Sequence, residues 1–232
     1  AAVAWVVGGT RGIGAAVAAE LAAQGRRVVV GARSRPDDVV HDVIDVDVTD
    51  DASVAASVER IVDRHGRLDE IVFAARTPGQ GTFLTMPDAE WREAIDTKLL
   101  GLVRVARHAL PELERTGGTL LALVGSAAAM ATAGHPLGCI NAAVRHAVRG
   151  LALEWAPRGV RVVGVSPGPT ATPSLVALLE EQATAAGRPR ADVEADLAGP
   201  MFRNRLLRPE QVAGLVAMVL GPHGALLNGK VL

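Results

Sequence analysis

Hydrophobic residues along the chain fall into two alternating patterns. Short runs of consecutive apolar, often β-branched residues are typical of strands buried on both faces, and they alternate with alanine-rich stretches of helical periodicity. The predicted strands are Val3–Val7, Arg27–Gly31, Asp42–Val46, Asp69–Ala74, Thr119–Val124, Val160–Val165 and a short one near Lys230–Leu232. This alternation predicts an α/β fold with a doubly wound parallel sheet.

The stretches between the strands have helical periodicity and suitable end residues. The predicted helices are Gly12–Gln24, Ala52–Arg64, Asp88–Leu113, Leu137–Ala156 and Pro209–Leu220. Asp50 or Asp51 is expected to cap one start, and Gly25 and Gly66 to follow two ends.

The chain shows no linker, repeat or low-complexity tract, so a single domain over residues 1–232 is predicted. One long segment, Ser174–Arg205 (174–205), lies between the sixth strand and the last helix. It is long enough to form a helical substrate lid over a site, inserted into the domain.

Composition narrows the possible partners. A chain of 232 residues with 49% hydrophobic residues can bury a substantial core, and its formal net charge of -1 favours neither nucleic acid nor an anionic membrane. Cys139 is the only cysteine, which excludes an internal disulfide and suits a reducing compartment. The first residues lack the basic region of a signal peptide, and no apolar run approaches the roughly 18 residues of a membrane span. A soluble cytoplasmic protein is expected.

A glycine-rich turn, "VVGGTRGIGAAVAAEL", follows the first predicted strand and opens the first helix. Gly8, Gly12 and Gly14 permit a tight turn, and the helix start offers N–H groups and a positive dipole end to a pyrophosphate. Glycines also serve plain turns, but this position in an alternating chain favours a dinucleotide site of the Rossmann type. The other loop residues predicted to bind the cofactor are Thr10, Arg11 and Ile13.

The end of the second strand indicates which dinucleotide binds. An NAD-specific fold usually places an acid there for the ribose 2′-OH, but "RVVVGARSRP" has Ala32 and Arg33. Because Arg11 and Arg33 could hold a 2′-phosphate, NADP(H) is favoured, although either arginine could instead be a solvated surface charge. Asp47 and Val48, from "DVDVTD", are placed to border the adenine.

The ordered motifs resemble those of the short-chain dehydrogenase/reductase family over nearly the whole chain. The resemblance rests on "GGTRGIG", "DVDVTD", "LDEIVFAAR", "IDTKLLG", "LVGSAAA" and "VRVVGVSPGPTATP". It implies a homo-oligomer, dimer or tetramer, paired through the helices Asp88–Leu113 and Leu137–Ala156. It also implies further cofactor-binding residues at Ala74, Ala75, Asn141, Pro167, Gly168 and Thr172, of which Gly168 and Thr172 would lie near the nicotinamide carboxamide.

The catalytic positions depart from this family. Members use a serine to hold the substrate oxygen, a tyrosine to transfer its proton, a lysine that lowers the tyrosine pKa, and an asparagine that holds a relay water. Ser126 matches the serine, whereas Leu137 aligns with the tyrosine and Asn141 with the lysine. No shift of alignment restores the pair, because the chain has no tyrosine and its only lysines are Lys98 and Lys230.

Lys98 occupies the relay-asparagine position in "AIDTKLLG", and its neighbours Ile95, Leu99 and Leu102 are expected to pack on the sheet. An ammonium aimed at that interior would be desolvated, which lowers its pKa. It would then suit a proton donor or an electrostatic clamp for a carbonyl oxygen or enolate. The alternative is a lysine that extends to a helix surface or a subunit interface.

Three further residues are weaker candidates for a role in the active site. His135 and Cys139 border the place of the missing tyrosine and could face substrate, but a loop histidine is commonly surface and a lone cysteine commonly packs as a small hydrophobe. Arg76 replaces a glycine that the family has beside the nicotinamide. Pointing inward, it would bind an anionic substrate or obstruct the cofactor; an outward orientation is equally compatible with the sequence. The six histidines lack partners at ligand spacing, so no metal site is predicted.

Two classes of function remain. The first is an NADP(H)-dependent carbonyl/alcohol oxidoreductase for a small organic substrate, which could be anionic and similar to a secondary metabolite. In it Ser126 and Lys98 polarise the substrate oxygen, and Lys98 or a water that it holds supplies the proton. The second is a non-redox enzyme (a cyclase, dehydratase or isomerase using Ser126, Lys98 and His135) or a catalytically silent subunit.

Overall fold

Six parallel strands form one sheet in the computed structural model, which describes residues 1–34, 39–76, 81–128 and 136–232. The strands are β1 (Val3–Val7), β2 (Arg27–Ala32), β3 (Asp42–Asp45), β4 (Glu70–Phe73), β5 (Thr119–Leu123) and β6 (Arg161–Val165). Their order in the sheet is β3-β2-β1-β4-β5-β6, so the chain changes direction across the sheet between β1 and β4. The predicted doubly wound fold is confirmed, and ligands of such sheets bind beyond the carboxyl ends of the strands near this change of direction.

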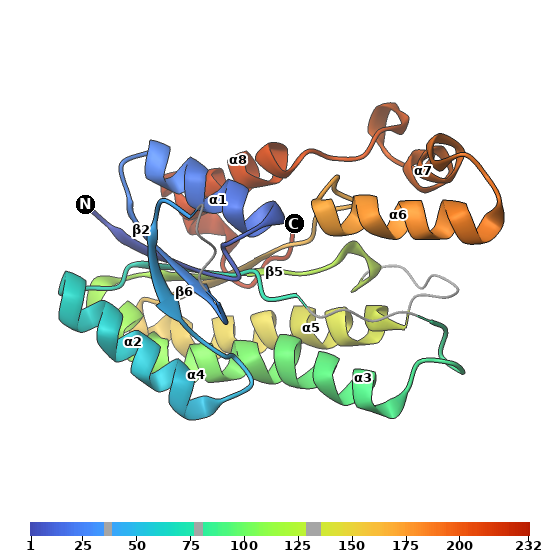
Figure 1. Cartoon of the computed structure of the whole chain (residues 1–232). Coiled ribbons are helices and arrows are strands. Elements are labelled where there is room, and N and C mark those ends of the chain that lie inside the picture. The colour runs from blue at the N-terminus through green and yellow to red at the C-terminus, as the bar shows by residue number, and fades with distance from the viewer. Residues whose placement is uncertain (35–38, 77–80, 129–135) are drawn as a thin grey trace.

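Helices cover both faces of the sheet (Figure 1). One face carries α1 (Gly12–Ala23) and α8 (Pro209–Leu220), and the other carries α2 (Asp51–His65), α4 (Gly101–Thr116) and α5 (Leu137–Trp155). The side chains of β1 explain the uninterrupted apolar run, because Trp5 packs on the α2 side while Ala4 and Val6 pack on the α1 side. Among the described residues, no helix has both the length and the apolarity needed to cross a membrane.

The predicted strand and helix bounds agree with the structure to within a few residues. β1 and α8 have the predicted ends, and Asp50 caps α2 by accepting a hydrogen bond from the N–H of Ala52 at 3.0 Å. The short last strand is reduced to a single parallel bridge between Val231 and Gly164.

The predicted helix Asp88–Leu113 contains a change of helical type. It begins as α3 (Asp88–Ala94), passes through a π-helical turn, η1 (Ile95–Leu100), and continues as α4. Leu102 is buried and Leu99 half-buried, but Ile95 is 39% exposed, so the expectation that Ile95 packs on the sheet is wrong. The physical reason is the wider π turn, which breaks the 3.6-residue periodicity that places residues four and seven apart on one face.

The segment after β6 leaves the sheet as α6 (Pro173–Ala186) and α7 (Arg190–Ala198), which project beyond its edge in Figure 1. Its two ends meet, because the N–H of Leu207 donates to the oxygen of Pro169 at 2.9 Å and the N–H of Ala171 donates to the oxygen of Leu207 at 2.8 Å. Thus one short parallel pairing joins the two ends of the segment between Ala171 and Leu207, the α6–α7 excursion.

Candidate active site

The loop between β1 and α1 lies closely against the loop after β4. Gly8 has a φ of +80°, and a Cβ added there would lie 2.8 Å from the oxygen of Ala74 and 3.2 Å from the nitrogen of Ala75. A Cβ at Gly14 would lie 2.2 Å from the oxygen of Gly8. The backbone can follow this path only without those side chains, and it brings the predicted residues Gly8, Gly14, Ala74 and Ala75 together.

The start of α1 is suited to an anion. Arg11 precedes the helix without a side-chain capping hydrogen bond, and the first turn holds no acidic residue. A Cβ at Gly12 would lie 3.2 Å from Cγ2 of Thr172, whose hydroxyl accepts a hydrogen bond from the N–H of Leu175 at the start of α6. The uncapped N–H groups and the positive end of the α1 dipole therefore fit a pyrophosphate. Thr10 and Ile13 belong to the same loop and first turn.

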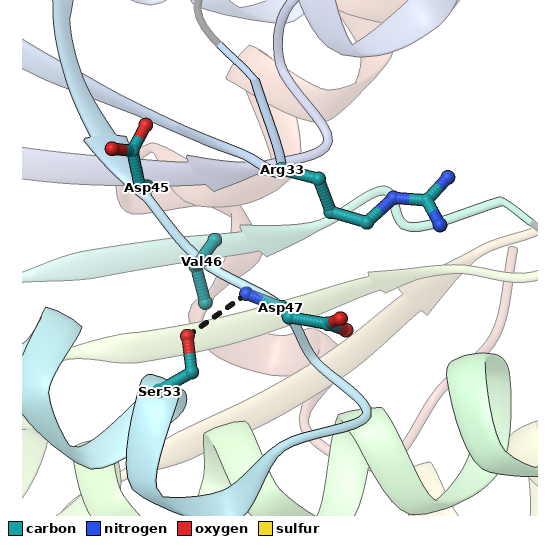
Figure 2. A pocket seen from close by; sticks show the side chains of 5 residues that line it. All are labelled: Arg33, Asp45, Val46, Asp47 and Ser53. Carbon is teal, nitrogen blue, oxygen red and sulfur yellow. Dashed lines mark hydrogen bonds between the residues drawn. The ribbon is translucent and has the colours of Figure 1, made fainter.

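A cavity of about 250 Å³ opens at the ends of β2 and β3. Figure 2 shows that the Arg33 and Asp47 side chains project to the same side of the strand ends, whereas Asp45 points away from them. Val46 and Ser53 complete the lining. Arg33 and Asp47 are thus brought together as expected, but Asp45, Val46 and Ser53 were not predicted from the sequence. The pairing of Ala32 with Asp45 across β2 and β3 is what places Asp45 beside this opening.

Asp47 and Val48 are fixed by short-range contacts. The Asp47 carboxylate accepts hydrogen bonds from the hydroxyl and the N–H of Thr49, at 2.7 and 2.9 Å, and these two bonds lower the pKa of Asp47, with Arg33 and Arg104 acting in the same direction. Val48 is buried, and its oxygen accepts a hydrogen bond from Arg104 at 3.0 Å. The rim of the cavity therefore carries the negative charge of the fixed Asp47 carboxylate and the positive charge of the exposed Arg33.

Lys98 lies in the π-helical turn η1 and reaches α5. Its Nζ donates a hydrogen bond to Oδ1 of Asn141 at 2.5 Å, and Asn141 is only 4% exposed. Burial of the ammonium, and after it the positive charge of Arg76, lowers the pKa of Lys98 to about 8. The structure thus contains a desolvated ammonium at Lys98, and the hydrogen-bond partner of this ammonium is the neutral amide of Asn141.

Asn141 connects Lys98 to the serine segment. A Cβ added to Gly125 would lie 2.4 Å from Nδ2 of Asn141, so the amide packs directly on the backbone that precedes Ser126. Ser126 is half-buried and begins the short helix η2 (Ser126–Ala128), against which α5 packs. Asn141 was predicted to bind the cofactor, from its place in the family alignment; the contact with Lys98 was not predicted.

The remaining predicted residues are placed as follows. Pro167 and Gly168 follow β6 and are half-buried, and a Cβ at Gly168 would lie 2.5 Å from Cε of Met201 in the α6–α7 excursion. Arg76 and Cys139 are exposed, while His135 lies outside the described residues. Within the described part of the chain, no group of three histidine, cysteine, aspartate or glutamate side chains could hold a metal ion.

Comparisons with known proteins place this arrangement in a family. A family model described as Enoyl-(Acyl carrier protein) reductase matches residues 7–232. The short-chain reductase protein NovJ of Streptomyces niveus is 32% identical over 98% of this chain and 90% of its own length. The cis-4-hydroxycyclohexanecarboxylate dehydrogenase of Sinomonas cyclohexanicum is 33% identical over 99% of this chain and 93% of its own. A crystal structure of a variant actinorhodin polyketide ketoreductase with NADPH superposes with a TM-score of 0.90 at 27% identity, covering 100% of this chain and 95% of that one.

The chain therefore belongs to the short-chain dehydrogenase/reductase family. The proteins that it is similar to are named as reductases and dehydrogenases, and these names support an oxidoreductase activity. The sequence of this chain contains no tyrosine.

Proposed function

We propose that this protein is an NADP(H)-dependent carbonyl/alcohol oxidoreductase in which Lys98 takes the place of the tyrosine as proton donor. The observation that carries the proposal is the position of Lys98, a half-buried ammonium linked through Asn141 to the backbone before Ser126. The names of the similar proteins support redox chemistry, and they do not favour the non-redox alternative.

The cofactor site would be shared between three segments. The start of α1 and the glycines of its loop fit the pyrophosphate, while Asp47 and Val48 would border the adenine. Arg33 is the exposed cation at the cavity beside β2, where a 2′-phosphate would be held by charge-assisted hydrogen bonds. When held at this site, NADPH would supply the hydride that reduces the carbonyl carbon.

The protein's part is to hold the substrate oxygen and move one proton. The Ser126 hydroxyl donates a hydrogen bond to the carbonyl oxygen, and Lys98 delivers a proton to it as the carbon is reduced. Lys98 is left as a neutral amine, which solvent protonates again. An amine with a pKa of about 8 is mainly charged at neutral pH yet readily gives up its proton, which suits a general acid. In alcohol oxidation, the neutral amine accepts the proton instead.

We infer that the substrate is a ketone bearing an anionic group. Lys98 and Arg76 are two cations close enough for one to lower the pKa of the other, and the hydrogen-bond partner of Lys98 is a neutral amide. A substrate carboxylate or an enolate would reduce the repulsion between them. The similarity to a dehydrogenase of a hydroxycyclohexanecarboxylate supports this class, because that compound carries both an alcohol and a carboxylate.

Two measurements test the proposal. Calorimetric titration compares the binding of NADPH and NADH, and the absorbance of the reduced nicotinamide is followed while cyclic ketones with and without a carboxylate are added. We expect NADPH to bind more tightly and carboxylate-bearing ketones to be reduced. Lys98→Ala should lower turnover by about 10²- to 10⁴-fold, the usual contribution of a general acid, and retain NADPH binding. Lys230→Ala is the matched control, since Lys230 is the other lysine of the chain and is exposed. Absence of NADPH binding, or equal turnover in Lys98→Ala, would contradict the proposal.

We also propose a homo-oligomer and a substrate lid. Leu100 in η1 and Leu153 in α5 are 42% and 80% exposed, and both lie on the helices predicted to pair between subunits. The excursion formed by α6 and α7 begins beside the phosphate loop, where Thr172 contacts Gly12, and Met201 from its far end covers Gly168. That placement suits a lid over the nicotinamide end of the site.

A further inference from the structure

We propose that Asn141 is a positioning residue that fixes the ammonium of Lys98 beside Ser126. The amide is not expected to touch the substrate; it acts through Lys98. The catalytic meaning of this proposal rests on the proposed function, but its central test measures Lys98 directly and needs no activity.

The contacts of Asn141 hold it in one orientation. The residue is buried on α5, with Oδ1 accepting the hydrogen bond from Nζ of Lys98 and Nδ2 packed against the Cα of Gly125. A side chain at residue 125 would occupy the space of the amide, since its Cβ would come within 2.4 Å of Nδ2. Gly125 thus leaves room for Asn141, and Asn141 in turn determines where the flexible lysine ends.

The amide also decides how strongly the charged form of Lys98 is favoured. Burial and the charge of Arg76 disfavour the ammonium, whereas an acceptor oxygen at hydrogen-bond distance favours it. On the two elements that carry the pair, Asp96 of η1 is paired with Arg104 at 2.8 Å, and Arg145 lies one turn beyond Asn141 on α5. Without the amide oxygen, the pKa of Lys98 should fall below about 8.

Two lysines in the chain make a direct measurement possible. Protein labelled with ¹³C at lysine Cε should give one resonance for Lys98 and one for Lys230, and Lys230→Arg assigns them. In the unchanged protein, the Lys98 resonance should report a pKa near 8.

Three variants change the amide in defined ways. Asn141→Leu should lower the pKa of Lys98 by about one unit, because a hydrogen bond to a charged group is lost. Asn141→Asp, which hardly changes the size, should raise it by about one to three units, because a carboxylate faces the ammonium. Gly125→Ala should displace the amide and lower the pKa without altering Asn141 itself. The Lys230 resonance is the internal control in every spectrum.

Enzyme kinetics would then connect the position of Lys98 with the reaction. The pH at which ketone reduction declines should move with the measured pKa of Lys98 in each variant, mainly through kcat.

An unchanged Lys98 titration in Asn141→Asp and Gly125→Ala would overturn the proposal, because a purely structural amide changes stability and leaves the titration alone. If the titration shifts as expected but the pH profile of reduction does not follow, Asn141 still positions Lys98, and it is the proposed catalytic role of Lys98 that fails.

Discussion

Replacing Lys98 by methionine should change the free energy of unfolding more favourably at neutral pH than at alkaline pH, when the variant is compared with the unchanged protein at the same pH. Methionine keeps an unbranched chain and removes the charge that burial disfavours. In the folded protein the pKa of Lys98 is lowered from 10.5 to about 8, so the unfolded chain binds this proton more tightly than the folded chain does. The native lysine therefore costs stability below pH 8, and that cost diminishes as the pH rises from about 8 to 10.5.

From the two pKa values, the stability lost by burying the Lys98 ammonium is about 3 kcal/mol at neutral pH and about 1 kcal/mol near pH 9.5. Methionine also leaves Oδ1 of Asn141 without its donor, which costs about 1 to 3 kcal/mol at every pH. The net gain at neutral pH is accordingly small. The informative quantity is the change with pH: the stability advantage of the variant should shrink by about 2 kcal/mol between neutral pH and about pH 9.5.

Urea unfolding of both proteins across this pH range measures that change. The sequence suits the experiment, because it contains no tyrosine to titrate in the same window, and Cys139 and Lys230 are common to both proteins and cancel in the difference. A stability difference that stays constant from neutral to alkaline pH would refute the argument that Lys98 is held as a desolvated ammonium.

Two other substitutions test the cofactor site and the assembly. Arg33→Ala should weaken NADPH binding by about 10- to 100-fold through loss of charge-assisted hydrogen bonds, with NADH binding nearly unchanged in calorimetry; equal losses for both nucleotides would contradict a 2′-phosphate contact. Leu153→Glu should convert the proposed oligomer to a smaller species in light scattering, because it puts a charge on an apolar side chain that is 80% exposed in the single chain; an unchanged mass would show that Leu153 does not contribute to the proposed interface.

The sheet and the glycine-rich loop between β1 and α1 were predictable because their signals are local. Five consecutive apolar residues specify β1, since a parallel strand is covered on both faces, and the glycines that follow specify a loop whose backbone must pass close to its neighbours. Asp47 and Arg33 follow from their positions at strand ends. Each of these features depends on residues adjacent in the sequence.

The contact between Lys98 and Asn141 was not predictable in the same way. The two residues are 43 positions apart, and the direction of Lys98 depends on a π-helical turn that a 3.6-residue pattern cannot reveal. The same turn accounts for the wrong expectation at Ile95. Asp45 and Ser53 were missed at the cavity because their proximity depends on the register of β2 with β3 and on how α2 packs, which composition does not encode.

The pairing of Leu207 with Pro169 and Ala171 has a consequence for how this protein can diversify. Since the excursion departs and returns at one joint, its length and sequence can vary while the geometry imposed on the sheet stays the same. The entropy of closing a longer loop grows only slowly with its length, so insertions between α6 and α7 should cost little stability. In the proposed role of a substrate lid, this segment could therefore acquire new substrate preferences without a change in the sheet.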